Sequence, residues 1–524
     1  MRNDDPRNRD REDVVLSVVQ EVLNDDGVDL EDNFFSAGGD SMRSLQVVEG
    51  LSRRGFSLQV VDVLTADSLR HLAGHVRETP GSPAPRAEPD GRSSGLLLPP
   101  GATSIRPASQ LQVGMLFLTE MAGEGTGIYL DFCGVRVAGA LQYAALEKAL
   151  AAVVERHEAL RSFFDLGTQA VPAQVVLPHA TVVPECATAA SDDEATAVVR
   201  RWREEVVDEG IDTEQAPPLR CHVVVQPRHF RLSLATHHSM LDGWSFNRLL
   251  VDLLTEYDAA LAGRAVALPA VPTSGDDFVR LERDAMSSPA TQRYWRRHNQ
   301  HFPVLGQMGE LARASRQLVE PMSDDSWARL RRAAARFQVP LKSLCLAAHA
   351  RAVGAWRDET EVVTGVVTNG RPEVDGADQL VGLFLNTVPV RLPVGRTWPD
   401  LAQAALDAER EMYPHRRYPL ATMLAEHGGP VFDVTFNFTH FHLVRELEQL
   451  HSVSVDGWWD EDIATFPMMV DVFAEDPMRG TGTMVTFDPD QVEQSEAQDL
   501  SDRFQAALHE AAALVDDLSG GGRD

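Results

Sequence analysis

Three stretches near the N-terminus carry hydrophobic residues at the spacing of a helix face. They are residues 11–24, 41–54 and 67–78, and in the first of them valines recur at helical intervals. This period puts the apolar side chains on one side of each helix, where they must pack against a neighbour. The pattern therefore predicts a small unit, a bundle of about four helices, over residues 10–78.

Farther along the chain, helical and strand periods intermix. Residues 143–164 predict one long amphipathic helix, and residues 220–238 predict two strands joined at Pro227. In residues 431–442, Phe and Val alternate with Asp, Thr and Asn, which predicts a strand with one buried face. Mixed elements of this kind indicate lobes in which helices pack against sheets, so an α/β fold class is expected.

Between these two parts lies a segment of different composition. Residues 79–104 are rich in Pro, Gly and Ser, and we interpret them as a flexible linker. The chain has 524 residues, and the roughly 420 that follow the linker are enough for two lobes.

Charge and cysteine usage narrow the class of partner and the compartment. The formal net charge is −30, which argues against nucleic acid or an anionic membrane surface as the main partner. We find no apolar run of membrane-spanning length and no apolar core of a signal peptide. The four cysteines form no Cys-x-x-Cys pair, so reduced thiols and a cytoplasmic location are expected.

Two adjacent histidines, His237 and His238, stand where a predicted strand ends, and Asp242 and Gly243 follow closely. Adjacent strand residues point to opposite faces, so one imidazole can face an internal channel while its neighbour packs into the structure. A metal site would need a third ligand at a matching spacing, and none is visible. Ser239 follows the pair but lies in no Gly-x-Ser-x-Gly elbow, so a hydrolase triad is not indicated.

A second candidate site begins the helix predicted from residue 41. The loop reads Gly38-Gly39-Asp40-Ser41-Met42, and Asp40 or Ser41 alone would be an ordinary helix N-cap. Residues 10–78 nevertheless resemble a peptidyl carrier protein of nonribosomal peptide synthetases, whose core motif has this form. The resemblance implies a 4′-phosphopantetheine group attached covalently to Ser41. A phosphodiester at a helix N-terminus also meets free backbone N–H groups.

The remainder of the chain, about residues 105–518, resembles a condensation domain of the same synthetases, which has the chloramphenicol acetyltransferase-like fold. Motifs of that family occur in order, and they are PASQLQVGMLF (107–117), RHEALRSFF (156–164), HHSMLDG (237–243), GDDFVRLE (275–282), VGLFLNTVPVRL (381–392), HRRYPL (415–420) and GGPVFDVTFNF (428–438). The resemblance implies a multi-domain protein whose two lobes form a V around a tunnel. We place the lobes at residues 105–275 and 276–518.

The same resemblance implies roles for the motif residues. The active-site motif comprises His237, His238, Asp242 and Gly243, and the acting group is His238, as a general base or by positioning the amine. His237 and Asp242 are interpreted as structural. A buried Asp242 needs a cation, for which Arg371 and Arg161 are the candidates, with Arg371 preferred. The expected tunnel-lining residues are Ser239, Trp244, Ser245 and Asn386.

These resemblances imply amide bond formation between a donor carried on Ser41 and an aminoacyl group on a downstream acceptor carrier. An upstream adenylation domain and a phosphopantetheinyl transferase are the other expected partners, with no metal and a monomeric state. The motifs look more like the subgroup that takes D-configured donors, yet there is no room for an epimerase between carrier and condensation domain. Three resolutions remain open: a glycine donor, which we favour, a D-amino acid selected upstream, or a misleading subgroup resemblance. Ester formation and a catalytically inactive recruitment domain are the alternatives.

Overall fold

The computed structural model describes residues 6–34, 37–39, 41–78, 96–123, 126–264, 268, 270–303, 305, 315–374, 376–440, 442–461, 465–476 and 479–514. Its N-terminal unit contains four helices within these ranges, α1 (Pro6–Leu23), α2 (Ser41–Arg53), α3 (Val60–Thr65) and α4 (Leu69–His75), with the short pair β1 (Phe56–Ser57) and β2 (Arg77–Glu78). Buried side chains from these helices form one core, including Val15, Val47, Leu51, Val63 and Leu72. The predicted helical unit is confirmed.

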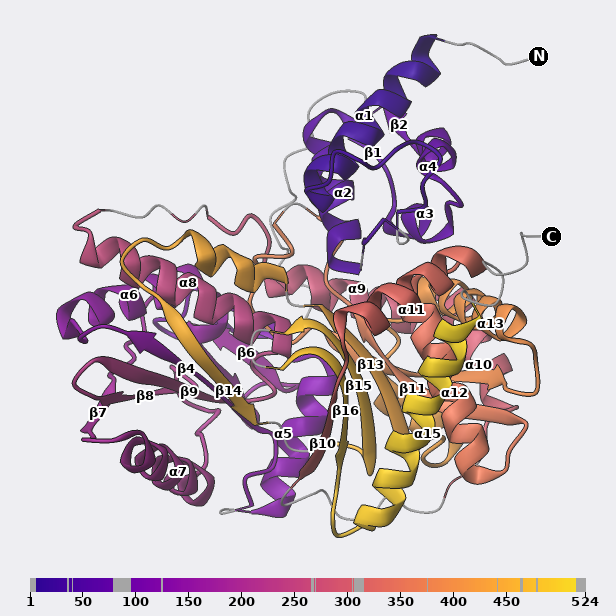
Figure 1. Cartoon of the computed structure of the whole chain (residues 1–524). Helices are drawn as coiled ribbons and strands as arrows, with labels where there is room; N and C mark the ends of the chain where they lie inside the picture. The colour runs from indigo at the N-terminus through magenta and orange to yellow at the C-terminus, as the bar shows by residue number, and fades with distance from the viewer. Residues whose placement is uncertain are drawn as a thin grey trace.

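The N-terminal lobe is built on a five-stranded sheet in the order β14-β4-β9-β8-β7. Its strands are β4 (Leu130–Ala138), β7 (Glu185–Thr188), β8 (Leu219–Val225), β9 (His229–His237) and β14 (Val455–Glu461). Helices α6 (Tyr143–Arg156) and α8 (Gly243–Leu261) cover one face, and α7 (Asp192–Glu209) covers the other (Figure 1). A smaller sheet of β3 (Ser104–Pro107), β6 (Ala173–Val176) and β5 (Ser162–Asp165) adjoins it, with α5 (Gln110–Ala122) between the lobes.

The expected strand pair is confirmed as β8 and β9, but the single helix over residues 143–164 is wrong. Helix α6 ends at Arg156 and is followed by the 3₁₀ turn η1 (Glu158–Arg161) and by β5. His157 leaves the helix because its imidazole contacts the buried Asp252 of α8, at 2.8 Å. Beyond it, Ser162 and Phe164 are buried while Phe163 is less so, a strand pattern that competes with the helical one.

The C-terminal lobe has a six-stranded sheet in the order β10-β16-β15-β13-β11-β12. These strands are β10 (Arg316–Pro321), β11 (Glu361–Asn369), β12 (Leu385–Pro393), β13 (Val434–His440), β15 (Met468–Asp476) and β16 (Gly480–Phe487). Helices α11 (Asp324–Phe337), α12 (Leu341–Arg357), α13 (Trp398–Met412) and α15 (Gln494–Ala513) pack on one face, where the largest apolar core lies. The remaining elements are α9 (Gly275–Ser287), α10 (Pro289–Asn299), η2 (Tyr413–His415), α14 (Leu420–His427) and η3 (His442–Gln449).

Two segments of the C-terminal half reach into the N-terminal lobe. Strand β14 pairs antiparallel with β4 and so completes the N-terminal sheet. The loop of residues 370–384, between β11 and β12, contacts the start of α8 through Gly382 and Phe384. The lobes are thus joined by two segments of the C-terminal half, a strand and a loop.

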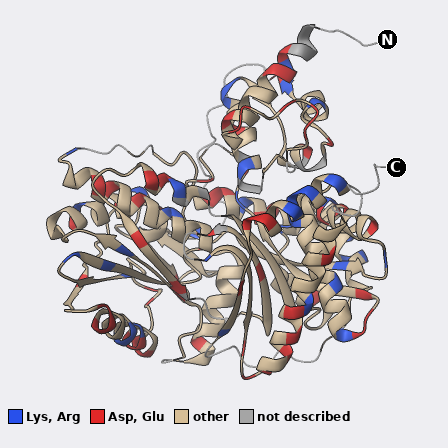
Figure 2. Cartoon of the chain, viewed as in Figure 1, with Lys and Arg blue, Asp and Glu red and all other residues tan. Residues whose placement is uncertain are grey.

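The helical N-terminal unit sits over the junction of the two lobes (Figure 1). Trp244 and Tyr413, one from each lobe, pack against its core. Figure 2 shows blue, basic segments on α11 beneath this unit. Among the described residues, no helix combines the length and apolar character needed to cross a bilayer.

Candidate active site between the two lobes

The two histidines at the end of β9 lie in different environments. His237 is the last residue of the strand and is 1% exposed, whereas His238 lines a cavity of about 830 Å³ between the lobes. The expected division between a packed imidazole and a channel-facing one is what the strand geometry produces.

Hydrogen bonds fix the ring of His237. The backbone N–H of Ser239 donates to its Nδ1, and its Nε2 lies 2.9 Å from the hydroxyl of Thr119. Because Nδ1 accepts, the proton of the neutral ring is on Nε2. Burial, with the neighbouring His238 second, lowers the pKa of His237 to about 3, so the ring stays neutral.

His238 is fixed from two directions. Its backbone N–H donates to the carbonyl oxygen of Tyr129, at 2.6 Å, and its Nδ1 lies 2.5 Å from Oδ2 of Asp131 on β4. Asp131 also lines the cavity. Sequence reasoning missed this residue; the only signal was one carboxylate between the apolar Leu130 and Phe132 of a strand.

Asp242 is the N-cap of α8 and joins the two lobes. Its Oδ1 accepts the backbone N–H of Ser245, and its Oδ2 accepts that of Phe384. The guanidinium of Arg371 donates to both oxygens, at 2.8 and 3.1 Å, and both side chains are 1% exposed. Burial lowers the pKa of Arg371, against the opposing effect of Asp242. The ion pair is fully buried, and each carboxylate oxygen of Asp242 accepts one hydrogen bond from Arg371 and one from a backbone N–H.

Arg161, the other candidate partner of Asp242, lies elsewhere: it donates to the backbone carbonyls of Val154 and Leu177, where it ties η1 to α6 and to the chain after β6.

Only some of the residues expected in the tunnel wall are there. Trp244 and Asn386 line the cavity. The prediction that Ser239 and Ser245 line the tunnel is wrong, because both side chains are fully buried and neither lines the cavity. The hydroxyl of Ser239 lies 2.7 Å from His237, and that of Ser245 binds Arg371 and the carbonyl of Gly382. Gly243 lines the cavity as the first residue of α8.

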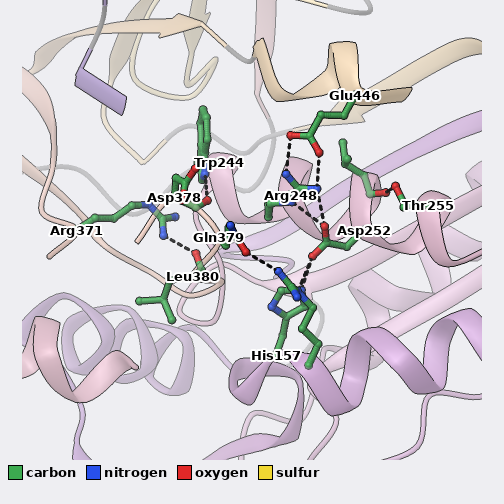
Figure 3. Close-up of polar contacts among 12 residues, drawn as sticks. His157, Trp244, Arg248, Asp252, Thr255, Arg371, Asp378, Gln379, Leu380 and Glu446 are labelled. Atoms are coloured by element: carbon green, nitrogen blue, oxygen red, sulfur yellow. Dashed lines mark hydrogen bonds and ion pairs between the residues drawn. The ribbon is translucent and has the colours of Figure 1, made fainter. Parts of the chain in front are cut away.

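A second buried ionic cluster supports the same loop (Figure 3). Asp252 of α8 accepts hydrogen bonds from Arg156 and Arg248 and contacts His157. Burial raises the pKa of Asp252, but these partners outweigh it and hold the value below the ordinary one.

From this cluster, contacts extend to the C-terminal half of the chain. Arg248 continues to Glu446 of η3, and Arg156 donates to Gln379 in the 370–384 loop. Arg371 donates to Leu380 in that loop (Figure 3). The loop is therefore anchored to the N-terminal lobe at two points. Its Arg371 binds Asp242, and its Gln379 accepts a hydrogen bond from the Asp252 cluster.

The polar face of β13 also belongs to the cavity. Thr435, Asn437 and Thr439 line it, whereas Val434 and Phe436 belong to the core and Phe438 contacts both the core and the cavity. Asn437 donates to Asp471 of β15, whose pKa burial raises to about 6. On the opposite wall, burial raises the pKa of Glu282 to about 7, although it accepts the backbone N–H of Gln110.

The cavity is continuous with the helical N-terminal unit. Gly38, Gly39 and Arg43, beside the first residue of α2, line the same cavity as His238. Gln46 of α2 donates to Asp378, at 3.0 Å. The backbone N–H of Gly376 donates to Glu49 of α2, at 3.4 Å. The turn that precedes α2 and the candidate catalytic histidine thus line one cavity.

The residues at the start of α2 fit a phosphodiester-linked arm. Gly38 has a φ of +101°, and a Cβ on Gly39 would lie 2.3 Å from the ring of Phe34, so the turn requires glycine. Arg43 donates to the carbonyl of Gly38, and a Cβ on Gly38 would lie 3.4 Å from the guanidinium of Arg331 of α11. A helix N-terminus flanked by two guanidinium groups suits a phosphate. Among the described residues, no cluster of three or more His, Cys, Asp or Glu gathers as metal ligands would.

Comparison with known family models shows the family to which the chain belongs. A family model described as a condensation domain matches residues 103–518, most of the chain. The chain belongs to the condensation domain family. A model described as a phosphopantetheine attachment site matches residues 13–76, so a carrier domain that holds this cofactor precedes the condensation domain.

Similar proteins agree with this assignment. The chain is 36% identical over 448 residues to the AMB antimetabolite synthetase AmbE of Pseudomonas aeruginosa, covering 82% of this chain and 21% of that protein. It is 26% identical over 334 residues to surfactin synthase subunit 3 of Bacillus subtilis, covering 62% of this chain and 26% of that subunit. The chain therefore matches about a fifth to a quarter of these relatives and is a carrier–condensation didomain of nonribosomal peptide synthetase type.

Solved structures share the fold of the condensation domain. The first condensation domain of the CDA synthetase superposes with a TM-score of 0.66 at 19% identity, covering 78% of this chain and 97% of that one. The X-domain in complex with OxyB from teicoplanin biosynthesis gives 0.63 at 20% identity, covering 79% and 96%. The expected multi-domain α/β fold of a condensation domain is thereby confirmed.

Proposed function

We propose that this didomain holds a donor acyl group on Ser41 and transfers it to the α-amine of an amino acid bound to a downstream acceptor carrier, forming an amide. The observation that carries the proposal is the single cavity that opens at Gly38 and Gly39 of the carrier and includes His238. When bound, the 4′-phosphopantetheine arm presents the donor as a thioester. Arg43 and Arg331 are the residues that would hold its phosphate.

Within that cavity, His238 is the group suited to act on the amine. With Nδ1 directed at Asp131, the neutral ring has Nε2 as its acceptor. The amine loses a proton as the new C–N bond forms and the C–S bond of the donor breaks, and the departing thiolate gains one. His238 positions the amine and accepts its proton late, because a neutral amine needs little deprotonation before attack.

We further propose that the donor is glycine or another residue that needs no epimerisation. The support is the order of the domains, since the carrier leads directly into a condensation domain whose motifs look like those that take D-configured donors. The proposed partners are the upstream adenylation domain that loads Ser41, a phosphopantetheinyl transferase and the acceptor carrier.

The decisive experiment is a transfer assay read by intact-protein mass spectrometry. Ser41 is loaded with glycyl-, L-alanyl- or D-alanyl-phosphopantetheine, and an aminoacylated acceptor carrier is added. We expect the glycyl group to move to the acceptor with the wild-type chain and not with His238→Ala. Transfer of only a chiral donor would contradict the glycine proposal.

Further arms distinguish the alternative functions. An acceptor with a hydroxyl in place of the amine tests for ester formation. If Ser41 is loaded but no donor moves to either acceptor, catalysis is contradicted and recruitment of another enzyme becomes the function to test. If the arm cannot be attached at Ser41, the carrier assignment of that residue fails.

A further inference from the structure

Asp131 occupies a position where the fold does not need a carboxylate. Its neighbours Leu130 and Phe132 face the other side of β4, where they pack against Trp202 and Val206 of α7. Because strand side chains alternate, Asp131 is directed to the cavity side of the sheet. It lines the cavity, and its side chain is 14% exposed.

What Asp131 does contact is the imidazole of His238. The two side chains are 14% and 23% exposed, and Oδ2 lies 2.5 Å from Nδ1. An ionised carboxylate can only accept, so Nδ1 carries the proton and Nε2 becomes the acceptor of the neutral ring. His237, the adjacent residue, has the opposite arrangement, with its proton on Nε2.

Other charged groups lie near the pair of Asp131 and His238. Among the described contacts, Asp131 is the carboxylate that lies against the His238 ring. Asp460 of the neighbouring β14 binds Arg479 through both of its oxygens, and Asp476 lies 3.7 Å from the same guanidinium. His237 lies behind the pair as a neutral ring. The carboxylates of β14 and β15 are therefore directed to Arg479, while Asp131 is directed to His238.

We infer that Asp131 is a positioning residue for the condensation reaction, which fixes His238 as the tautomer with Nε2 available to the acceptor amine. The inference rests on the proposed function for its catalytic consequence, but not for the tautomer itself. During transfer, the carboxylate also stabilises the ring while Nε2 holds the amine's proton. The proton passes on to the departing thiolate, so Asp131 itself takes up no proton in the transfer.

The first test reads the tautomer in the unloaded chain. Long-range ¹H–¹⁵N correlation spectra of histidine-labelled protein separate protonated from unprotonated ring nitrogens, and His238→Gln assigns the signals. We expect protonated Nδ1 for His238 in the wild type, and a change to protonated Nε2 in Asp131→Asn, whose amide can donate to Nδ1. His237 serves as an internal control and should keep its proton on Nε2.

The second test measures single-turnover transfer from loaded Ser41 at saturating and limiting acceptor. Asp131→Asn should lower the saturated rate by about 10- to 100-fold, less than the loss caused by removing His238. The acceptor concentration for half-maximal rate should stay within about twofold, because Asp131 does not bind the acceptor itself. Asp456→Asn is the matched control, since Asp456 of β14 binds Arg136 near the other end of β4.

The two tests separate the inference from the proposed function. An unchanged His238 tautomer in Asp131→Asn, or a rate within twofold of wild type, overturns the role of Asp131 while amide formation by the wild type stands. If the wild type transfers nothing, the proposed function fails, and the spectra alone decide whether Asp131 sets the tautomer. A loss of rate equal to that of Asp456→Asn would mark a merely structural effect and would overturn the inference.

Discussion

Two aspartates beside the histidine motif are held in opposite ways. Asp242 faces Arg371 in a fully buried pair, and its remaining lone pairs accept backbone N–H groups. Asp131 faces His238 at the edge of a cavity, where both side chains retain contact with solvent. One pair joins the lobes, and the other is placed where substrates would arrive.

The difference distinguishes an ion pair that supports the fold from a pair that is suited to the reaction. A buried ion pair is costly to break, since removing one partner leaves a charge in a dry environment. A pair at the edge of a cavity contributes little to stability, and its value lies in the orientation and protonation of the imidazole. Variants of the first pair should therefore change folding, and variants of the second should change rate.

Breaking the buried pair should have the largest effect. Arg371→Met leaves Asp242 without its cation, and we expect the condensation domain to lose about 3–5 kcal/mol of unfolding free energy. Urea unfolding followed by tryptophan fluorescence measures the loss. Adding Asp242→Asn to Arg371→Met removes the stranded charge, so the double variant should be more stable than the single one. A single variant within about 1 kcal/mol of wild type would show that the pair does not clamp the lobes.

The histidine pair should divide in the same manner. His238→Ala should reduce amide formation by about 10²- to 10⁴-fold with an unchanged melting temperature. His237→Ala should instead cost about 2–3 kcal/mol of stability, because it leaves a cavity and removes the partner of the Thr119 and Ser239 hydroxyls. Differential scanning calorimetry and the transfer assay measure the two effects separately. Loss of stability in His238→Ala would contradict the division.

The sequence predicted which residues of the motif are structural better than it predicted the tertiary contacts that hold them. Alternation along a strand predicted that one histidine packs into the core and the other faces a channel, and the family resemblance indicated that His238 is the second of these. Arg371 was preferred as the partner of Asp242, and the structure brings them together across 129 positions of the chain. These features follow from local period and from the need of a buried charge for a partner.

Other features depend on tertiary contacts that no local pattern reveals. The contact of Asp131 with His238 joins residues 107 positions apart and needs β4 and β9 paired in register. Helix α6 stops at Arg156 because Asp252, far along the chain, binds the next side chain. Strand β14 joins the N-terminal sheet although it comes from the other half of the chain, so a lobe boundary at residue 275 describes most elements of each lobe but not this strand.

Glu282 is a third carboxylate that can be compared with Asp242 and Asp131. It is buried, and burial and the backbone N–H of Gln110 are what act on its pKa. Its pKa is raised to about 7 by burial, so the folded chain binds a proton that the unfolded chain releases near pH 4.5. Stability from this group is thus complete below pH 4.5 and is lost as the pH rises to about 7, by at most about 3 kcal/mol. Glu282→Gln keeps an acceptor for Gln110 and should flatten that dependence. Melting temperatures from pH 4 to pH 8 measure it, and parallel curves for variant and wild type would contradict the assignment.

The smallest effect should come from the contact that seats the carrier. Gln46 of α2 donates to Asp378, whose carbonyl accepts the indole N–H of Trp244. One partly buried hydrogen bond contributes about 1 kcal/mol, so Gln46→Ala should slow transfer from Ser41 about fivefold. The rate from a free aminoacyl thioester should not change, because that donor needs no seated carrier. Arg54→Ala, which removes an ion pair to Glu21 within the carrier, is the control. Equal slowing with both donors would mean that Gln46 acts on the active site itself, through the loop that Arg371 anchors, and not on docking.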